Sequence, residues 1–150
     1  MRWEYPADIY SGLHFPALNG YIPTDFSLRC EDSGEPIGES DRERSQQEPP
    51  ALLHQTNNFR MWYKMDQFWR VPKTYIRLSL VSPTPYDSPR AMTLNRIYQR
   101  VLNDDLNSFV YDASLAGCNY RVSCAPTGYK VSVSGYSEKL PMLLETVTSR

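Results

Sequence analysis

Two histidines and three cysteines are the side chains of this 150-residue chain best suited to bind a metal or to act as nucleophiles. His14 and His54 lie far apart, and neither has a second histidine at ligand spacing or a carboxylate on an evident helix face. Zinc takes three or four such ligands. We therefore expect both histidines to be structural or exposed, and we assign no catalytic, metal-binding or cofactor-binding residue to this chain.

The cysteines are Cys30, Cys118 and Cys124, an odd number that argues against a disulfide framework and for a reducing compartment. Cys118 and Cys124 fall on one predicted strand, about 20 Å apart at ~3.3 Å per residue. A disulfide needs Cα atoms within roughly 7 Å, so these two cannot pair. No local signature joins any cysteine to a histidine, and we expect no Cys–His nucleophile.

Other chemical signatures are weak. The seven glycines form neither GxGxxG nor GxxxxGK, so no phosphate-binding loop is predicted. The carboxylate pairs Asp104–Asp105 and Glu138–Glu145 are predicted on helices, where we expect solvated faces.

A mixed aromatic and basic cluster is the one pattern typical of single-strand nucleic-acid binding. Its members are Trp62, Tyr63, Lys64, Trp69, Arg70, Lys73 and Arg77. Aromatic residues beside a hairpin more often pack within the protein, and the net charge of −1 produces no global field toward nucleic acid or membrane. We therefore expect neither as a partner.

Charge divides the chain into regions. Residues 31–50 hold seven acidic and two basic residues and no aromatic one. Such a segment buries too little apolar surface to offset a backbone ordering cost of ~1 kcal/mol per residue, so we predict a disordered acidic loop. No segment has the apolar length of a signal peptide or of a membrane span, which indicates a cytoplasmic protein.

The elements that position these residues follow the acidic loop. A short strand and turn are predicted from Arg60, and residues 73–81 alternate like a half-buried strand. Ser88 and Pro89 are typical of a helix start. Apolar residues then recur three and four apart from Leu94 to Ala113, and a glycine at position 117 ends the helix.

Two further strands, "CNYRVSC" and "YKVSVSGY", flank the turn "APTG". A last helix is predicted from Ser137, with Pro141 tolerated in its first turn. The predicted order is β-β-α-β-β-α. This order favours an α+β fold, an antiparallel sheet with helices packed on one face. The long apolar stripe of the first helix needs a larger sheet than these strands supply, so we expect the chain alone to be marginally stable.

Several segments resemble, in one order, the insulinase/pitrilysin family of zinc metallopeptidases, and within it the insulin-degrading enzyme-like branch. "LHFPALNGYIPTDFSL" resembles the link between the family's second and third domains. "PPALLHQTNNFRMWYKMDQFWRVPKTYI" resembles the start of the third domain, with its landmarks "WYK" and "VPK". The segment "DDLNSFVYDASLAGCNYRVSCAPTGYKVSVSGYSEKLPMLLETV" resembles the part that follows. The resemblance covers roughly Leu13 to Arg150.

This resemblance implies a partial insulinase-type domain. Residues 1–30 correspond to the tail of the preceding domain and a linker, 31–50 to the acidic loop, and 51–150 to the N-terminal part of the middle/third domain. The family's zinc motif, HxxEH, lies in another domain and does not occur here. The resemblance implies a non-catalytic segment of the wall that encloses peptide substrates. Its partners are the enzyme's remaining domains and, in the whole enzyme, the peptide; zinc belongs to the catalytic domain.

Two alternatives remain open from the sequence. The first is a free-standing α+β module that binds peptides or proteins without enzymatic activity. The second is a single-strand nucleic-acid binder that uses the cluster from Trp62 to Arg77.

Overall fold

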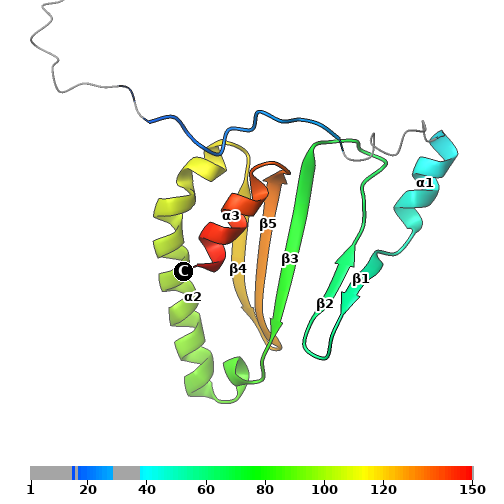
Figure 1. Cartoon of the computed structure of the whole chain (residues 1–150). Helices are drawn as coiled ribbons and strands as arrows, with labels where there is room; N and C mark the ends of the chain where they lie inside the picture. Colours follow the sequence, from blue (N-terminus) through cyan, green and yellow to red (C-terminus); the bar gives the residue numbers. More distant parts are fainter. Residues whose placement is uncertain (1–14, 16, 29–37, 150) are drawn as a thin grey trace, which may run out of the picture.

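The computed structural model describes residues 15, 17–28 and 38–149. Its centre is an antiparallel sheet in the order β3-β5-β4, formed by β3 (Lys73–Val81), β4 (Asn119–Ala125) and β5 (Gly128–Tyr136). Two helices, α2 (Pro89–Leu115) and α3 (Leu140–Thr148), cover one face of this sheet (Figure 1). The predicted α+β class, with helices packed on one face, is confirmed.

Strict alternation along the strands decides which face the helices cover. The residues that face the helices form two rows across the sheet, Ile76–Val133–Tyr120 and Leu78–Val131–Val122. These apolar side chains belong to the core or pack against it. The residues between them in sequence are polar and point to the other face, as expected for an antiparallel sheet with one covered face.

The core lies between the sheet and the two helices. The helices contribute Leu106, Val110 and Ala113 from α2, and Leu140, Leu143 and Val147 from α3, all almost fully buried. Burying an aliphatic side chain of this size stabilises the fold by about 1.5–3 kcal/mol. Both helices are therefore packed against the sheet by buried apolar side chains. In α2, all of these fully buried side chains lie in the C-terminal half of the helix.

The bounds predicted for α2 are confirmed. Its N-cap Ser88 accepts a hydrogen bond from the Ala91 backbone N–H at 3.1 Å, and Pro89 occupies the first turn. Just beyond the helix, Gly117 has a φ of 78°, the left-handed conformation that a glycine adopts without strain.

The apolar stripe of α2 is only half covered. Leu94, Ile97 and Val101 in its N-terminal half are 56%, 54% and 62% exposed, whereas Leu106 is fully buried. Polar contacts hold this half of the helix instead. The Gln99 side chain donates to the Val122 carbonyl and accepts from the Cys124 N–H, both on β4.

A hairpin precedes the sheet and differs from the prediction. Its strands are β1 (Ala51–Gln55) and β2 (Arg60–Tyr63), which pair only with each other. The sequence predicted β2 as part of the main sheet and did not predict β1. "ALLHQ" lacks clean alternation, and the register shifts between Leu52 and His54, so the pairing with β2 defines this strand.

Helix α1 (Glu39–Gln47) forms within the stretch predicted as a disordered loop. Residues 31–37 of that stretch lie outside the described residues. The ammonium group of Lys64 accounts for the end of α1, because it donates to the carbonyls of Gln46 and Glu48 at 2.7 and 2.6 Å. A cation at these carbonyls donates hydrogen bonds to groups that have no partner within the helix, and its charge interacts favourably with the negative end of the helix dipole. This partner lies beyond the segment, so the segment's composition could not reveal it.

The last helix begins later than predicted. α3 starts at Leu140, and Pro141 lies in its first turn as expected. Ser137 does not cap it, because its hydroxyl pairs with that of Thr74 at 2.8 Å and its N–H donates to the Pro72 carbonyl. Ser137 therefore fixes the start of β3 rather than the start of α3.

Candidate functional surfaces

The candidate metal ligands and nucleophiles are scattered in the structure. His54 is exposed on β1, Cys118 is buried just before β4, and Cys124 is half-buried within β4. Both of these cysteines are free thiols. His14 and Cys30 lie outside the described residues. Within the described ranges, no three His, Cys, Asp or Glu side chains are grouped so that they could hold a metal ion.

The mixed aromatic and basic cluster does not form one surface. Trp62 is on the β1–β2 hairpin, Lys64 caps α1, and the Trp69 ring packs edge-on against Phe68 at 4.9 Å between centroids. Arg77 lies on β3 in the main sheet. The residues that looked contiguous in sequence are therefore divided between β2, the loop of residues 64–72 and β3.

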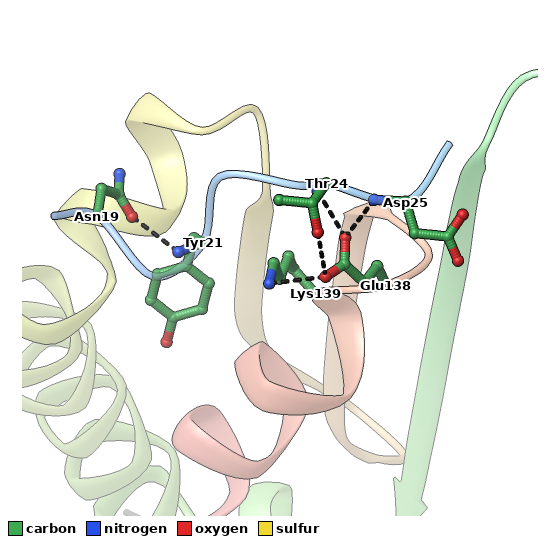
Figure 2. Close-up of polar contacts among 6 residues, drawn as sticks. All are labelled: Asn19, Tyr21, Thr24, Asp25, Glu138 and Lys139. Carbon is green, nitrogen blue, oxygen red and sulfur yellow. Dashed lines mark hydrogen bonds and ion pairs between the residues drawn. The ribbon is translucent and has the colours of Figure 1, made fainter. Parts of the chain in front are cut away.

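Glu138 corrects the expectation of a solvated helix face. It lies before α3 rather than in it, and its carboxylate accepts hydrogen bonds from the backbone N–H groups of Thr24 and Asp25 at 2.7 and 2.8 Å (Figure 2). It also accepts from the Thr24 hydroxyl and pairs with the Lys139 ammonium at 2.8 Å. The paired residues Asp104 and Asp105 are exposed on α2, as predicted.

These contacts dock residues 19–26 onto the helical layer. Asn19 donates from its side chain to the Asp112 carbonyl on α2 at 2.7 Å, and Tyr21 shares a hydroxyl hydrogen bond with Thr146 on α3. Phe26 adds an edge-on ring contact with Tyr136. A segment that precedes the domain in sequence therefore becomes part of its surface. In the sequence this contact is visible only as the Glu138 carboxylate, and a single carboxylate does not reveal that its partners are the backbone N–H groups of Thr24 and Asp25.

The contacts of Glu138 predict an acid-dependent docking of this segment. The hydrogen bond and ion pair with Lys139, then the N–H groups of Asp25 and Thr24, lower the pKa of Glu138 from 4.5 to about 2. A lowered carboxyl pKa means that docking is fully supported above pH 4.5 and lost as the pH falls through about 2. We expect the amide proton of Thr24 to titrate with a midpoint near 2 in an NMR pH series.

Glu138→Gln is expected to remove the part of that titration that comes from Glu138, because an amide carries no charge to lose, and to leave only the smaller effect of the neighbouring Asp25 carboxyl. The matched control Glu145→Gln changes an exposed carboxylate on α3 and should leave the Thr24 titration unchanged. A Thr24 amide that titrates near 4.5, or whose titration is as large in Glu138→Gln as in the unmodified chain, would show that the contact does not form in solution.

The uncovered face of the main sheet is polar and hollowed. Its hollow, of about 650 Å³, is lined by the cations Arg77, Arg121 and Lys130 together with neighbouring polar groups, including Tyr75 and Ser132. The strand register places Arg77, Ser132 and Arg121 in one row across the three strands. Lys130 lies in the next row, between Ser79 and Ser123. We call this surface the cationic sheet face.

Tyr75 links these groups. The Arg77 guanidinium donates to the Tyr75 hydroxyl at 3.2 Å and lies 5.4 Å from its ring centroid. A hydrogen bond with the Ser132 side chain, the one from Arg77 and the charges of Arg77 and Arg121 together lower the pKa of the Tyr75 phenol. Hydrogen bonds with Ser132 on β5 and Arg77 on β3 therefore hold the Tyr75 hydroxyl on this face, and the charges of Arg77 and Arg121 act on its pKa in the same direction. The sequence signal is the alternation of basic and apolar residues on β3, β4 and β5, which forms no contiguous motif because the three cations lie on three strands.

A comparison with known families identifies the kind of domain. Residues 1–150 match the family model described as the middle or third domain of peptidase M16. The chain belongs to this family. The resemblance to the insulinase metallopeptidases that was drawn from the sequence landmarks is thus confirmed.

Relatives of this M16 middle domain include proteins named insulin-degrading enzyme and nardilysin. The chain is 38% identical over 138 residues to "Insulin-degrading enzyme-like 1, peroxisomal" of Arabidopsis thaliana, with 92% of this chain covered. It is 33% identical to nardilysin of Rattus norvegicus over 97% of its length, and 30% identical to human insulin-degrading enzyme over 99%. The matches cover only 13%, 12% and 13% of those relatives, so the chain corresponds to a small part of each.

Proposed function

We propose that this chain is a non-catalytic middle-domain segment of an insulinase-like zinc metalloendopeptidase, where it forms part of the wall of the chamber that encloses short peptides. The observation that carries the proposal is the match of residues 1–150 to the middle or third domain of peptidase M16. In this proposal the zinc ion and the hydrolytic residues belong to another domain of the longer enzyme. The chain supplies surface, and the remaining domains and the peptide substrate are its partners.

Uncovered apolar side chains support other domains as partners. On α2, Leu94, Ile97 and Val101 are each more than half exposed. On the hairpin, Leu53 and Trp62 are 57% and 58% exposed. Large apolar side chains gathered at a surface typically mark contacts with other protein. The proposal assigns both surfaces to the neighbouring domains of the longer enzyme.

We propose a cytoplasmic location, because the odd number of three cysteines in the sequence favours a reducing compartment. No helix in the described part of the chain combines the length and apolar character needed to cross a membrane. One relative is named peroxisomal, which makes the peroxisome the specific alternative for a localisation experiment.

Sequencing the transcript upstream of the codon for Met1 tests the proposal most directly. We expect an open reading frame that continues upstream and encodes HxxEH. An in-frame stop codon with an untranslated leader would contradict the proposal and favour the free-standing interaction module.

The purified 150-residue chain is expected to hydrolyse no peptide and to hold no stoichiometric zinc. The measurements are cleavage of a quenched fluorogenic peptide and metal analysis across the chromatographic peak. A matched longer protein that includes the HxxEH region is the positive control. Chelator-sensitive cleavage that follows the 150-residue chain through purification would contradict a non-catalytic role.

A further inference from the structure

We propose that the cationic sheet face binds acidic peptide segments and so biases the enzyme toward substrates that carry Asp or Glu near the bound stretch. This inference rests on the proposed function, because it assigns a substrate class to one part of the chamber wall. It gives a role to the side chains of Arg77, Arg121 and Lys130, whereas the family match identifies only the kind of domain.

The positive charge of this face is not neutralised within the described part of the chain. No carboxylate there lies within ion-pairing distance of Arg77, Arg121 or Lys130, and the polar groups beside them are hydroxyls and an amide. Arg77 is held by the Tyr75 hydroxyl, which orients the guanidinium without removing its charge. The face therefore presents donors and positive charge that a carboxylate complements.

The spacing of the cations suits an extended peptide. Arg77 and Arg121 lie on the two outer strands of one row, about 10 Å apart at ~4.8 Å per strand. Lys130 is one step of two residues along the central strand, about 7 Å from that row. Alternate side chains of an extended peptide repeat at about the same 7 Å. Two acidic side chains on one side of such a peptide can therefore reach two cations together.

The surroundings favour a peptide over a single-stranded nucleic acid. Binding of single strands relies on several aromatic rings that stack on successive bases. Of the rings in the sequence cluster, Trp62 lies on the β1–β2 hairpin and the Trp69 ring packs edge-on against Phe68, and neither ring lines the hollow of the cationic sheet face. Tyr75 has one side of its ring occupied by the Arg77 guanidinium. The face thus offers charge and hydrogen-bond donors but few stacking surfaces.

The experiment measures peptide binding to the whole 150-residue chain by fluorescence anisotropy. The probes are a short dye-labelled peptide of alternating Glu and Ser, its Gln/Ser and Lys/Ser counterparts, and a single-stranded oligonucleotide of similar length. We expect the Glu/Ser peptide to bind most tightly. Its Kd should rise about tenfold between low and high salt, because exposed charges are screened.

The double variant Arg77→Gln/Arg121→Gln is expected to raise the Kd for the Glu/Ser peptide about tenfold, since two charge-assisted contacts are lost. The control Arg96→Gln/Arg100→Gln makes the same charge change on exposed positions of α2 and should leave the Kd unchanged. The charge reversal Arg77→Glu/Arg121→Glu should shift the preference to the Lys/Ser peptide. Circular dichroism checks that each variant keeps the fold.

Several results would overturn the inference. They are equal binding of the Gln/Ser and Glu/Ser peptides, an equal loss of affinity in the α2 control, or tighter binding of the oligonucleotide through the same arginines. Binding is read on the chain itself, without peptidase activity, whereas the wall proposal is tested by the upstream reading frame. If the chain does not prefer the Glu/Ser peptide but its reading frame continues upstream to HxxEH, only the binding inference is wrong. The failure of this inference and the failure of the proposed function are therefore distinguishable.

Discussion

Replacing Leu106 by alanine is expected to lower the free energy of unfolding by about 3–5 kcal/mol, as for other fully buried leucines. Leu106 is 0% exposed and lies among Val110, Ala113 and the buried side chains of α3. The change leaves a cavity in the core between the helices and the sheet. The cavity cannot close easily, because its walls are formed by helices and strands that are packed against one another. Chemical denaturation followed by circular dichroism measures the loss.

Leu94→Ala is the matched control, because it makes the same change on the same helix at a position that is 56% exposed. It should change the free energy of unfolding by less than about 1 kcal/mol. A similar loss in both variants would mean that the N-terminal half of α2 is covered in solution, for instance by self-association. Sedimentation of the Leu94→Ala variant separates that outcome from an error in the position of the core.

Replacing Gly128 by alanine is expected to lower the free energy of unfolding by about 3 kcal/mol or more. Gly128 is buried at the start of β5 with a φ of +131°, which side-chain-bearing residues rarely adopt. An added Cβ would overlap the Leu80 carbonyl oxygen and approach the Ser82 nitrogen to 2.8 Å. Both obstacles are backbone atoms, so relief requires β3 and β5 to separate where Val81 pairs with Gly128.

Gly20→Ala controls for the general effect of adding a methyl group to a glycine, because a Cβ there meets nothing within 4 Å. We expect its stability to stay within ~0.5 kcal/mol of the unmodified chain. In Gly128→Ala, hydrogen exchange should be faster at the amides of Leu80 and Val81 at the end of β3 and of Tyr129 at the start of β5, where the two strands pair. Unchanged stability of this variant would contradict the close pairing of the two strands at this end of the sheet.

The elements with strong local signals could be read from the sequence. The serine–proline start and glycine end of α2 are local chemistry, and the structure reproduces them at Ser88 and Gly117. The alternation in β3 and β5 assigned each residue to one of two faces, because successive side chains of a strand point in opposite directions. The helix-facing rows of the sheet follow from that rule.

Contacts between distant segments could not be read in this way. Ser137 looked like a helix cap, but its hydroxyl pairs with Thr74, and helix α1 ends where the Lys64 side chain reaches it. Glu138 looked like a solvated carboxylate, but it accepts the N–H groups of Thr24 and Asp25. In each case the partner lies far along the chain, and local periodicity carries no information about which partner a side chain meets.

The sequence by itself determined the family, the α+β class, the bounds of the long helix and the two faces of β3 and β5, because all of these depend on residue order along the chain. Only the tertiary structure decided which half of the α2 stripe is buried, since coverage depends on where α3 and β4 lie. It also decided that Arg77, Arg121 and Lys130 share one face. They lie on three different strands, and pairing brings such residues together only when the strands adopt one register.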